Sequence, residues 1–219
     1  MDRITDAFVW PFRDPDWLGK VAVIGLILLV PIAGGIVGLG WMIGNIRRLR
    51  AGEERLAPLD SAYLGAGFQL FVVYLVYYFV LAVIAAVLYV PAIVILSQQG
   101  RDSSNPALVA LGVGLLLLTF SIVTLGLLAL TFAMPAIVLA VDHGGIGAGL
   151  RVDQIVHRMR VSVINTLIAG LMLIAAGLIG QVGSVVCIVG VVFTSAYALA
   201  MQAWIIRSYE LGSATPAKT

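Results

Sequence analysis

The sequence predicts an all-α, polytopic membrane helix bundle with about five or six membrane segments. Of its 219 residues, 61% are hydrophobic and only 11% are charged, whereas soluble domains are about 45–50% apolar and about 25% charged. The apolar residues also form runs long enough to cross a bilayer core, and short loops between the runs carry the charges. This composition excludes a water-soluble enzyme, a secreted disulfide scaffold and a nucleic-acid-binding protein. We therefore expect one integral membrane domain over residues 1–219.

The first residues predict an amphipathic helix that lies on the membrane surface. Ile4, Ala7 and Phe8 share one helical face, and acidic and basic residues occupy the other positions. The next helix is expected to begin at Asp14 and Pro15, because aspartate is a good N-cap and proline suits the first helical position.

The first apolar run, residues 21–46, is interrupted in its middle by Pro31, Gly34 and Gly35. Proline removes a helical hydrogen bond, and paired glycines add conformational freedom. Two interpretations fit this break. The run is either one kinked span or a broken, re-entrant hairpin of two short helices.

The distribution of basic residues favours the hairpin. A single span would put nine basic residues on one side of the membrane and four on the other. A hairpin puts twelve on one side and leaves only Arg101 opposite. Since cytoplasmic loops are enriched in Lys and Arg, we predict a protein of the cell (plasma) membrane with both termini in the cytoplasm.

The remaining runs predict further membrane helices and a second interfacial one. Residues 67–96 and 107–140 are long apolar runs, preceded by the candidate caps Asp60 and Asn105. Residues 144–160 have apolar side chains at helical spacing opposite charged ones, which is typical of an amphipathic interfacial helix. The last apolar run is about twice a span in length and is divided at Gly180 to Ser184, which predicts two antiparallel helices.

Short matches suggest a weak internal duplication of about residues 1–96 and 107–210. The segment GAGFQ at 65–69 recurs as GAGLR at 147–151, and VPAIVIL at 90–96 recurs as MPAIVLA at 134–140. In each half a surface helix is expected to lead into a broken apolar hairpin.

The sequence contains few candidate residues for catalysis, proton transfer or metal binding. No ionisable residue lies deep in a predicted span, although such groups mark most proton-coupled transporters and intramembrane enzymes. Asp142, His143, Asp153 and His157 could be combined as a metal site, but a loop cap and a local ion pair are the favoured interpretation. We therefore expect no catalytic residue, no metal and no cofactor.

Two groups of arginines are the candidate functional residues. They are Arg47, Arg48 and Arg50, and Arg151, Arg158 and Arg160. At the inner leaflet such residues set the topology and can also contact anionic lipid. The expected partners are membrane lipids and, through small-xxx-small pairs such as Gly40 and Gly44, other membrane subunits or a second copy. No nucleic-acid partner is expected.

These features predict a non-enzymatic membrane protein that is an accessory or scaffold subunit of a complex, or a lipid-contacting organiser. The alternative is a channel or carrier for a small neutral or lipidic solute, because interrupted helices often line transport sites.

The opening of the chain also resembles a known family. The segment WPFRDPDWLG, the break LLVPIAGG and the exit GWMIGNIRRLRAGEE are similar to the bacterial and archaeal membrane proteins grouped as domain of unknown function 4013. Similarity extends over nearly the whole chain. The resemblance implies an integral membrane protein and assigns no catalytic residue.

Overall fold

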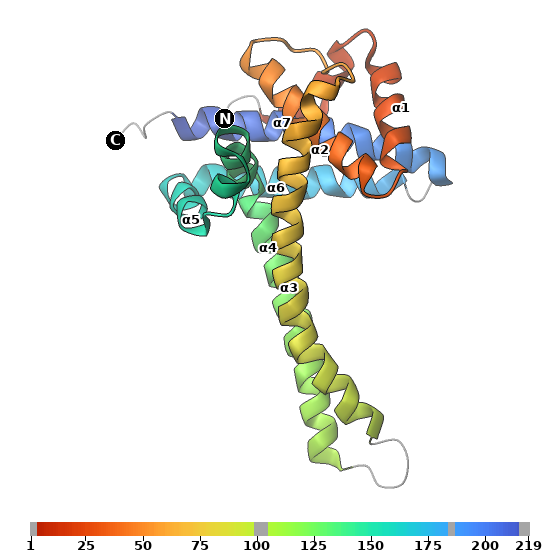
Figure 1. Ribbon diagram of the computed structural model, residues 1–219, viewed down its shortest axis with the longest axis vertical. Coiled ribbons are helices and arrows are strands. Elements are labelled where there is room, and N and C mark those ends of the chain that lie inside the picture. Colours follow the sequence, from red (N-terminus) through yellow and green to blue (C-terminus); the bar gives the residue numbers. More distant parts are fainter. Residues whose placement is uncertain (1–3, 99–104, 184–186, 215–219) are drawn as a thin grey trace. The chain divides into compact units, whose positions relative to one another are not determined.

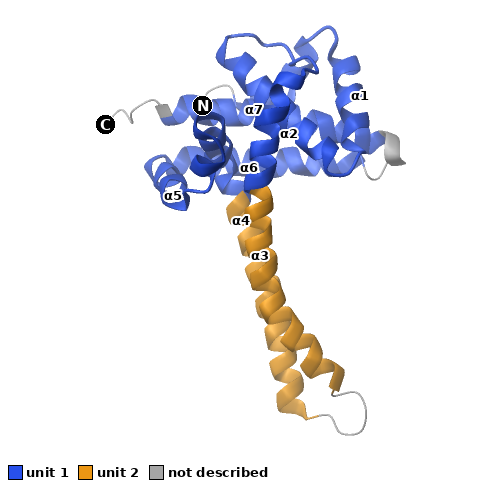
Figure 2. Ribbon diagram, in the orientation of Figure 1, with its two compact units in different colours: residues 1–73, 131–219 blue, residues 74–130 orange. Residues whose placement is uncertain are grey.

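The computed structural model describes residues 4–98, 105–183 and 187–214, and every regular element among them is helical (Figure 1). This confirms the predicted all-α class. The elements are η1 (Ile4–Phe8), η2 (Trp10–Arg13), α1 (Trp17–Leu28), α2 (Ala33–Arg50), η3 (Ser61–Tyr63), α3 (Leu64–Gln98), α4 (Pro106–Gly149), α5 (Val152–Val161), α6 (Val163–Val182) and α7 (Cys187–Ala214). They form two compact units, residues 1–73 with 131–219, and residues 74–130 (Figure 2).

Three helices of the described chain, α3, α4 and α6, are long and apolar enough to cross a membrane. This number is smaller than the five or six segments expected from the sequence. Helix α1 is too short, with only 12 residues, and the 18 residues of α2 include three arginines. The apolar residues of α2 and α7 also pack largely into the core of the first unit. An apolar run does not by itself distinguish contact with lipid from contact with protein.

The N-terminal segment packs on α7 as two 3-10 turns. The side chains of Ile4, Ala7 and Trp10 are buried. The indole of Trp10 donates a hydrogen bond to the carbonyl of Ala200 at 3.2 Å and stacks on Trp204, with 5.6 Å between ring centroids. The apolar face that predicted a membrane-surface helix is therefore covered by protein.

The interruption of the first apolar run is confirmed. Helix α1 ends at Leu28 and α2 begins at Ala33, and Ile32 between them has a positive φ of 65°. A Cβ on Gly34 would lie 2.2 Å from the carbonyl oxygen of Ile27, so only glycine allows this close approach. Gly35 has no such neighbour, and Pro31 lies in the turn before α2.

The helices of the second unit, residues 74–98 of α3 and 106–130 of α4, pack side by side. Leu81 and Leu96 of α3 fill the space above Gly126 and Gly112 of α4. The predicted cap at Asn105 is confirmed, since its side-chain oxygen accepts from the amide of Ala107 at 3.0 Å. The predicted loop around Arg101 lies outside the described residues.

Asp60 is also a cap, but of the 3-10 turn η3 that precedes α3. The expectation for Asp14 is wrong, because α1 begins at Trp17 with Asp16 as its N-cap residue. The carboxylate of Asp14 instead accepts hydrogen bonds from Lys20 and from the amides of Asp16 and Leu56.

The second amphipathic helix is confirmed with a later start, while its place at the membrane interface stays a prediction. Helix α4 continues to Gly149 with a kink at Gly145, which has φ 67° and ψ −161°, and the amphipathic helix α5 follows from Val152. The predicted division of the last run is also confirmed, because α6 ends at Val182 and α7 begins at Cys187. The two helices are antiparallel neighbours (Figure 1), and Ser162 before α6 bonds Ser213 near the end of α7. The internal duplication stays a prediction.

Candidate functional site

Arg47 and Arg50, at the end of α2, lie in an ion-pair cluster with residues of α4 and α7. A terminal nitrogen (Nη2) of Arg47 is 2.9 Å from Asp142 Oδ1. Arg50 pairs with Asp142 and also with Glu210, whose Oε2 is 2.9 Å from its Nε. Arg207 adds a contact of 2.7 Å to the same oxygen of Glu210. We call these five residues the ion-pair cluster; its three arginines exceed its two carboxylates by one positive charge.

The hydrogen bonds of the cluster favour the ionised forms of Glu210 and Arg50. Burial alone would raise the pKa of Glu210, but the guanidinium groups of Arg50 and Arg207 outweigh burial and hold this pKa below its ordinary value. Burial alone would lower the pKa of Arg50, but its bonds to Glu210 and Asp142 raise it above the ordinary value. The carboxylate of Asp142 is buried, with only 3% of its side chain exposed, whereas the side chain of its partner Arg47 is 44% exposed.

Arg48, the third arginine of α2, pairs with Glu53 in the turn that follows the helix. All three arginines of this helix therefore have carboxylate partners. The charges that the sequence assigns to the membrane surface are compensated here within the protein.

The arginines of α5 have a different environment. Arg151, Arg158 and Arg160 are exposed, and within the described chain none of them forms an ion pair. Ile155 is buried and attaches the helix to the rest of the unit. Three apolar side chains of the same helix are also exposed: Val152, Val156 and Val161. Helix α5 thus presents both cationic and apolar groups to its surroundings.

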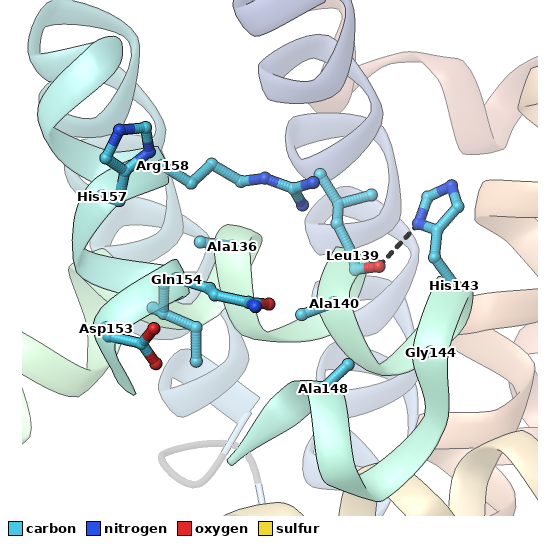
Figure 3. A pocket seen from close by; sticks show the side chains of 11 residues that line it. Ala136, Leu139, Ala140, His143, Gly144, Ala148, Asp153, Gln154, His157 and Arg158 are labelled. Carbon is cyan, nitrogen blue, oxygen red and sulfur yellow. Dashed lines mark hydrogen bonds between the residues drawn. The ribbon is translucent and has the colours of Figure 1, made fainter. Parts of the chain in front are cut away.

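A groove of about 670 Å³ separates α5 from the end of α4 (Figure 3). Arg158 and Gln154 extend from α5 toward the α4 wall, where the Nδ1 atom of His143 lies 2.6 Å from the carbonyl oxygen of Leu139. The floor and walls near α4 are mainly apolar. The residues on this part are Ala136, Leu139, Ala140, Gly144, Ala148 and Ile155.

The groove continues into a second hollow of about 400 Å³ that reaches α7. The two hollows share Leu139, His143, His157 and Arg158. The α7 side is more polar and adds Val161, Ser162, Tyr209, Glu210 and Ser213. Glu210 therefore belongs both to the ion-pair cluster and to the wall of this groove.

The four residues weighed as a metal site do not form one. Asp142 is held by Arg47 and Arg50, while His143 and His157 line the groove. Among the residues that the structure describes, no three His, Cys, Asp or Glu side chains are arranged to hold a metal ion.

The sequence reasoning missed Asp142, Tyr209 and Glu210 as participants. One local signal was available, because Arg207 and Glu210 have the i, i+3 spacing of a helical ion pair. No local signal connects Arg50 to Asp142, which lies 92 residues further along the chain.

The fold and the groove define a helical membrane protein with a groove, apolar on the α4 side and polar on the α7 side, beside an amphipathic helix. Residues 23–206 match the family model described as "Protein of unknown function (DUF4013)". The chain belongs to this family, as the resemblance of its opening segment indicates. No curated protein and no solved structure gives a significant match.

Proposed function

We propose that this membrane protein is a non-enzymatic, lipid-contacting organiser in the cell membrane, with α5 at the anionic inner leaflet. One observation carries the proposal. Helix α5 exposes Arg151, Arg158 and Arg160, without ion pairs among the described residues, beside exposed valines.

The physical basis is the way amphipathic helices bind membranes. Each basic side chain near an anionic surface contributes about 1 kcal/mol, and exposed apolar side chains insert at the headgroup boundary. The arginines of α2 contribute less, because Asp142, Glu210 and Glu53 already compensate their charge. Lipid contact is thus assigned to Arg151, Arg158 and Arg160.

The small-residue pairs that suggested a scaffold subunit are occupied inside the chain. A Cβ on Gly40 would lie 2.5 Å from the carbonyl oxygen of Tyr63, and one on Gly44 would lie 2.9 Å from the ring atom Cε2 of the same tyrosine. These contacts join α2 to the turn η3 that precedes α3. Because these glycines already contact the chain itself, a lipid-contacting role is better supported than a scaffold role.

The charge distribution along the sequence supports cytoplasmic termini, because twelve basic residues then share one side with α5. Epitope tags at both ends are expected to be reached by antibody only after cells are permeabilised. Access to one end on intact cells would overturn this topology.

The experiment is reconstitution of the full chain in nanodiscs that contain phosphatidylglycerol and phosphatidylcholine, followed by quantification of the lipids retained with the protein. We expect phosphatidylglycerol to be enriched around the wild type, less so at high salt because screening weakens surface charges. Arg151→Gln and Arg160→Gln, singly and together, should reduce the enrichment. Arg48→Gln removes a charge that is already paired and is the matched control. Equal enrichment in all variants would contradict the proposal.

A carrier of a small neutral or lipidic solute is the second candidate, supported by the irregular backbone at Ile32 between α1 and α2. Flux of such a solute into proteoliposomes would favour it. A helix break that serves only packing predicts no flux.

A further inference from the structure

We propose that the groove between α4, α5 and α7 is a binding site for the phosphate group of one amphiphile, a single anionic phospholipid. The proposal rests on the proposed function only in placing α5 at a lipid surface. It differs in assigning a defined site with one occupant, whereas the surface of α5 contacts many lipids.

The first argument is Tyr209. This residue is 0% exposed and lines the α7 wall of the groove, and within the described chain its hydroxyl has no hydrogen-bond partner. A buried hydroxyl without a partner costs free energy. An oxygen atom of a bound phosphate would accept its hydrogen bond.

The second argument is the charge around the groove. Arg158 extends into it from α5 (Figure 3) and forms no ion pair among the described residues. Behind the α7 wall, the ion-pair cluster retains one excess positive charge. Two buried guanidinium nitrogens of this cluster, Arg50 Nη2 and Arg207 Nε, also lack acceptors in the described structure. The combination favours an anion, and a guanidinium recognises phosphate oxygens well.

The third argument is the apolar part of the lining. Ala136, Ala140 and Ile155 line the groove away from Tyr209 and Ser213. A free phosphate would leave this part unfilled, whereas the chains of a lipid would bury it. An amphiphile therefore fits both ends of the groove.

Two carboxylates also line the groove and must be reconciled with an anionic ligand. Glu210 is bonded to both Arg50 and Arg207, so its charge is compensated. Asp153 lies in the first turn of α5, where the helix dipole stabilises a negative charge. Asp153 lines only the α4 hollow, not the hollow that contains Tyr209.

The test is lipid titration of the full chain in mild detergent, followed by native mass spectrometry. We expect one phosphatidylglycerol to bind per chain, with phosphatidylcholine and uncharged diacylglycerol binding more weakly. Tyr209→Phe should weaken the affinity about tenfold and Arg158→Gln about a hundredfold, the usual scales for a hydrogen bond to a charged group and for a charged pair. Tyr209→Phe should raise the melting temperature of the lipid-free protein, because it removes a buried hydroxyl that has no partner in the described structure.

Tyr197→Phe is the matched control on the same helix. Its hydroxyl donates to the carbonyl of Phe8, so its loss should lower the melting temperature without changing lipid affinity. The double variant Arg151→Gln/Arg160→Gln should lose bulk enrichment of anionic lipid but keep the single tight lipid. The single tight lipid and the bulk enrichment of anionic lipid therefore test the groove and the surface of α5 separately.

A parallel titration with inorganic phosphate separates the two sources of the anion. Phosphatidylglycerol binding that millimolar phosphate does not displace supports the lipid headgroup. Binding of inorganic phosphate alone, weakened by Arg158→Gln, would retain the phosphate site and overturn the lipid as its occupant. Equal binding of diacylglycerol and phosphatidylglycerol, or unchanged affinity in Tyr209→Phe and Arg158→Gln, would overturn the site itself.

Discussion

Helix α2 carries three arginines, and α5 together with its N-cap residue Arg151 carries three more, yet the two groups have opposite environments. Arg47, Arg48 and Arg50 all have carboxylate partners. The arginines of α5 are exposed, and the described residues supply no ion pair for them. The number of basic residues in a segment therefore does not measure the charge available to a membrane. What matters is which carboxylates the fold brings to them.

The largest effect on stability is expected from Asp142→Asn. The change removes a carboxylate that is 3% exposed and serves both Arg47 and Arg50. We expect the free energy of unfolding to fall by about 3 kcal/mol, the scale for removing one partner of a buried ion pair. Thermal melting of the detergent-solubilised protein measures it. Glu53→Gln, which breaks the exposed pair with Arg48, is the control and should cost at most about 1 kcal/mol.

A similar loss of unfolding free energy in both variants would contradict this expectation, since it would mean that Asp142 stabilises the fold no more than a surface pair does. A large loss restricted to Asp142→Asn would support it.

Acid should weaken the paired regions before it affects α5. Burial alone would raise the pKa of Asp14, but hydrogen bonds from Lys20 and the amides of Asp16 and Leu56 lower it below its ordinary value, as the arginines do for Glu210. A lowered folded-state pKa gives stability that is fully present above the unfolded pKa, about 4, and is lost as pH falls through the folded pKa.

We therefore expect melting temperatures that are constant from neutral pH to about pH 5 and that fall below about pH 4. Asp14→Asn should cost about 2 kcal/mol at neutral pH, the scale of a hydrogen bond to a charged group. Its deficit should shrink in acid, where the wild-type carboxylate is itself protonated. A deficit independent of pH would show that the charge of Asp14 is not what stabilises the fold.

Arg207→Gln should have an intermediate effect. Glu210 keeps its bonds to the Nε of Arg50 when Arg207 is replaced, so one ion pair remains. We expect a loss of about 1 kcal/mol in the same melting assay. A loss as large as that of Asp142→Asn would mean that Arg207, and not Arg50, holds the cluster together.

The smallest effect is expected from Arg160→Gln on α5. An exposed arginine without a partner among the described residues should change the free energy of unfolding by less than about 0.5 kcal/mol. The melting temperature should therefore stay at the wild-type value while enrichment of phosphatidylglycerol falls. A destabilised variant with unchanged lipid enrichment would reverse the roles assigned to the two helices.

The elements predicted well are those whose signals are local. The apolar spacing of α5, the cap at Asn105 and the break at Pro31 and Gly34 were all visible in the sequence, and the structure has each of them. Asp14 shows the limit of such signals. Its aspartate–proline pair is typical of a helix start, but its carboxylate bonds the amide of Leu56, 42 residues further along the chain.

The sequence by itself determined that the chain is a helical membrane protein, where its long apolar helices lie and where the first run breaks. Hydropathy and backbone geometry act over a few neighbouring residues, so these features need no knowledge of distant contacts. Only the tertiary structure decided which arginines are paired and which line a groove. That outcome depends on α2, α4 and α7 meeting at one place, and the partners Arg50 and Asp142 are 92 residues apart.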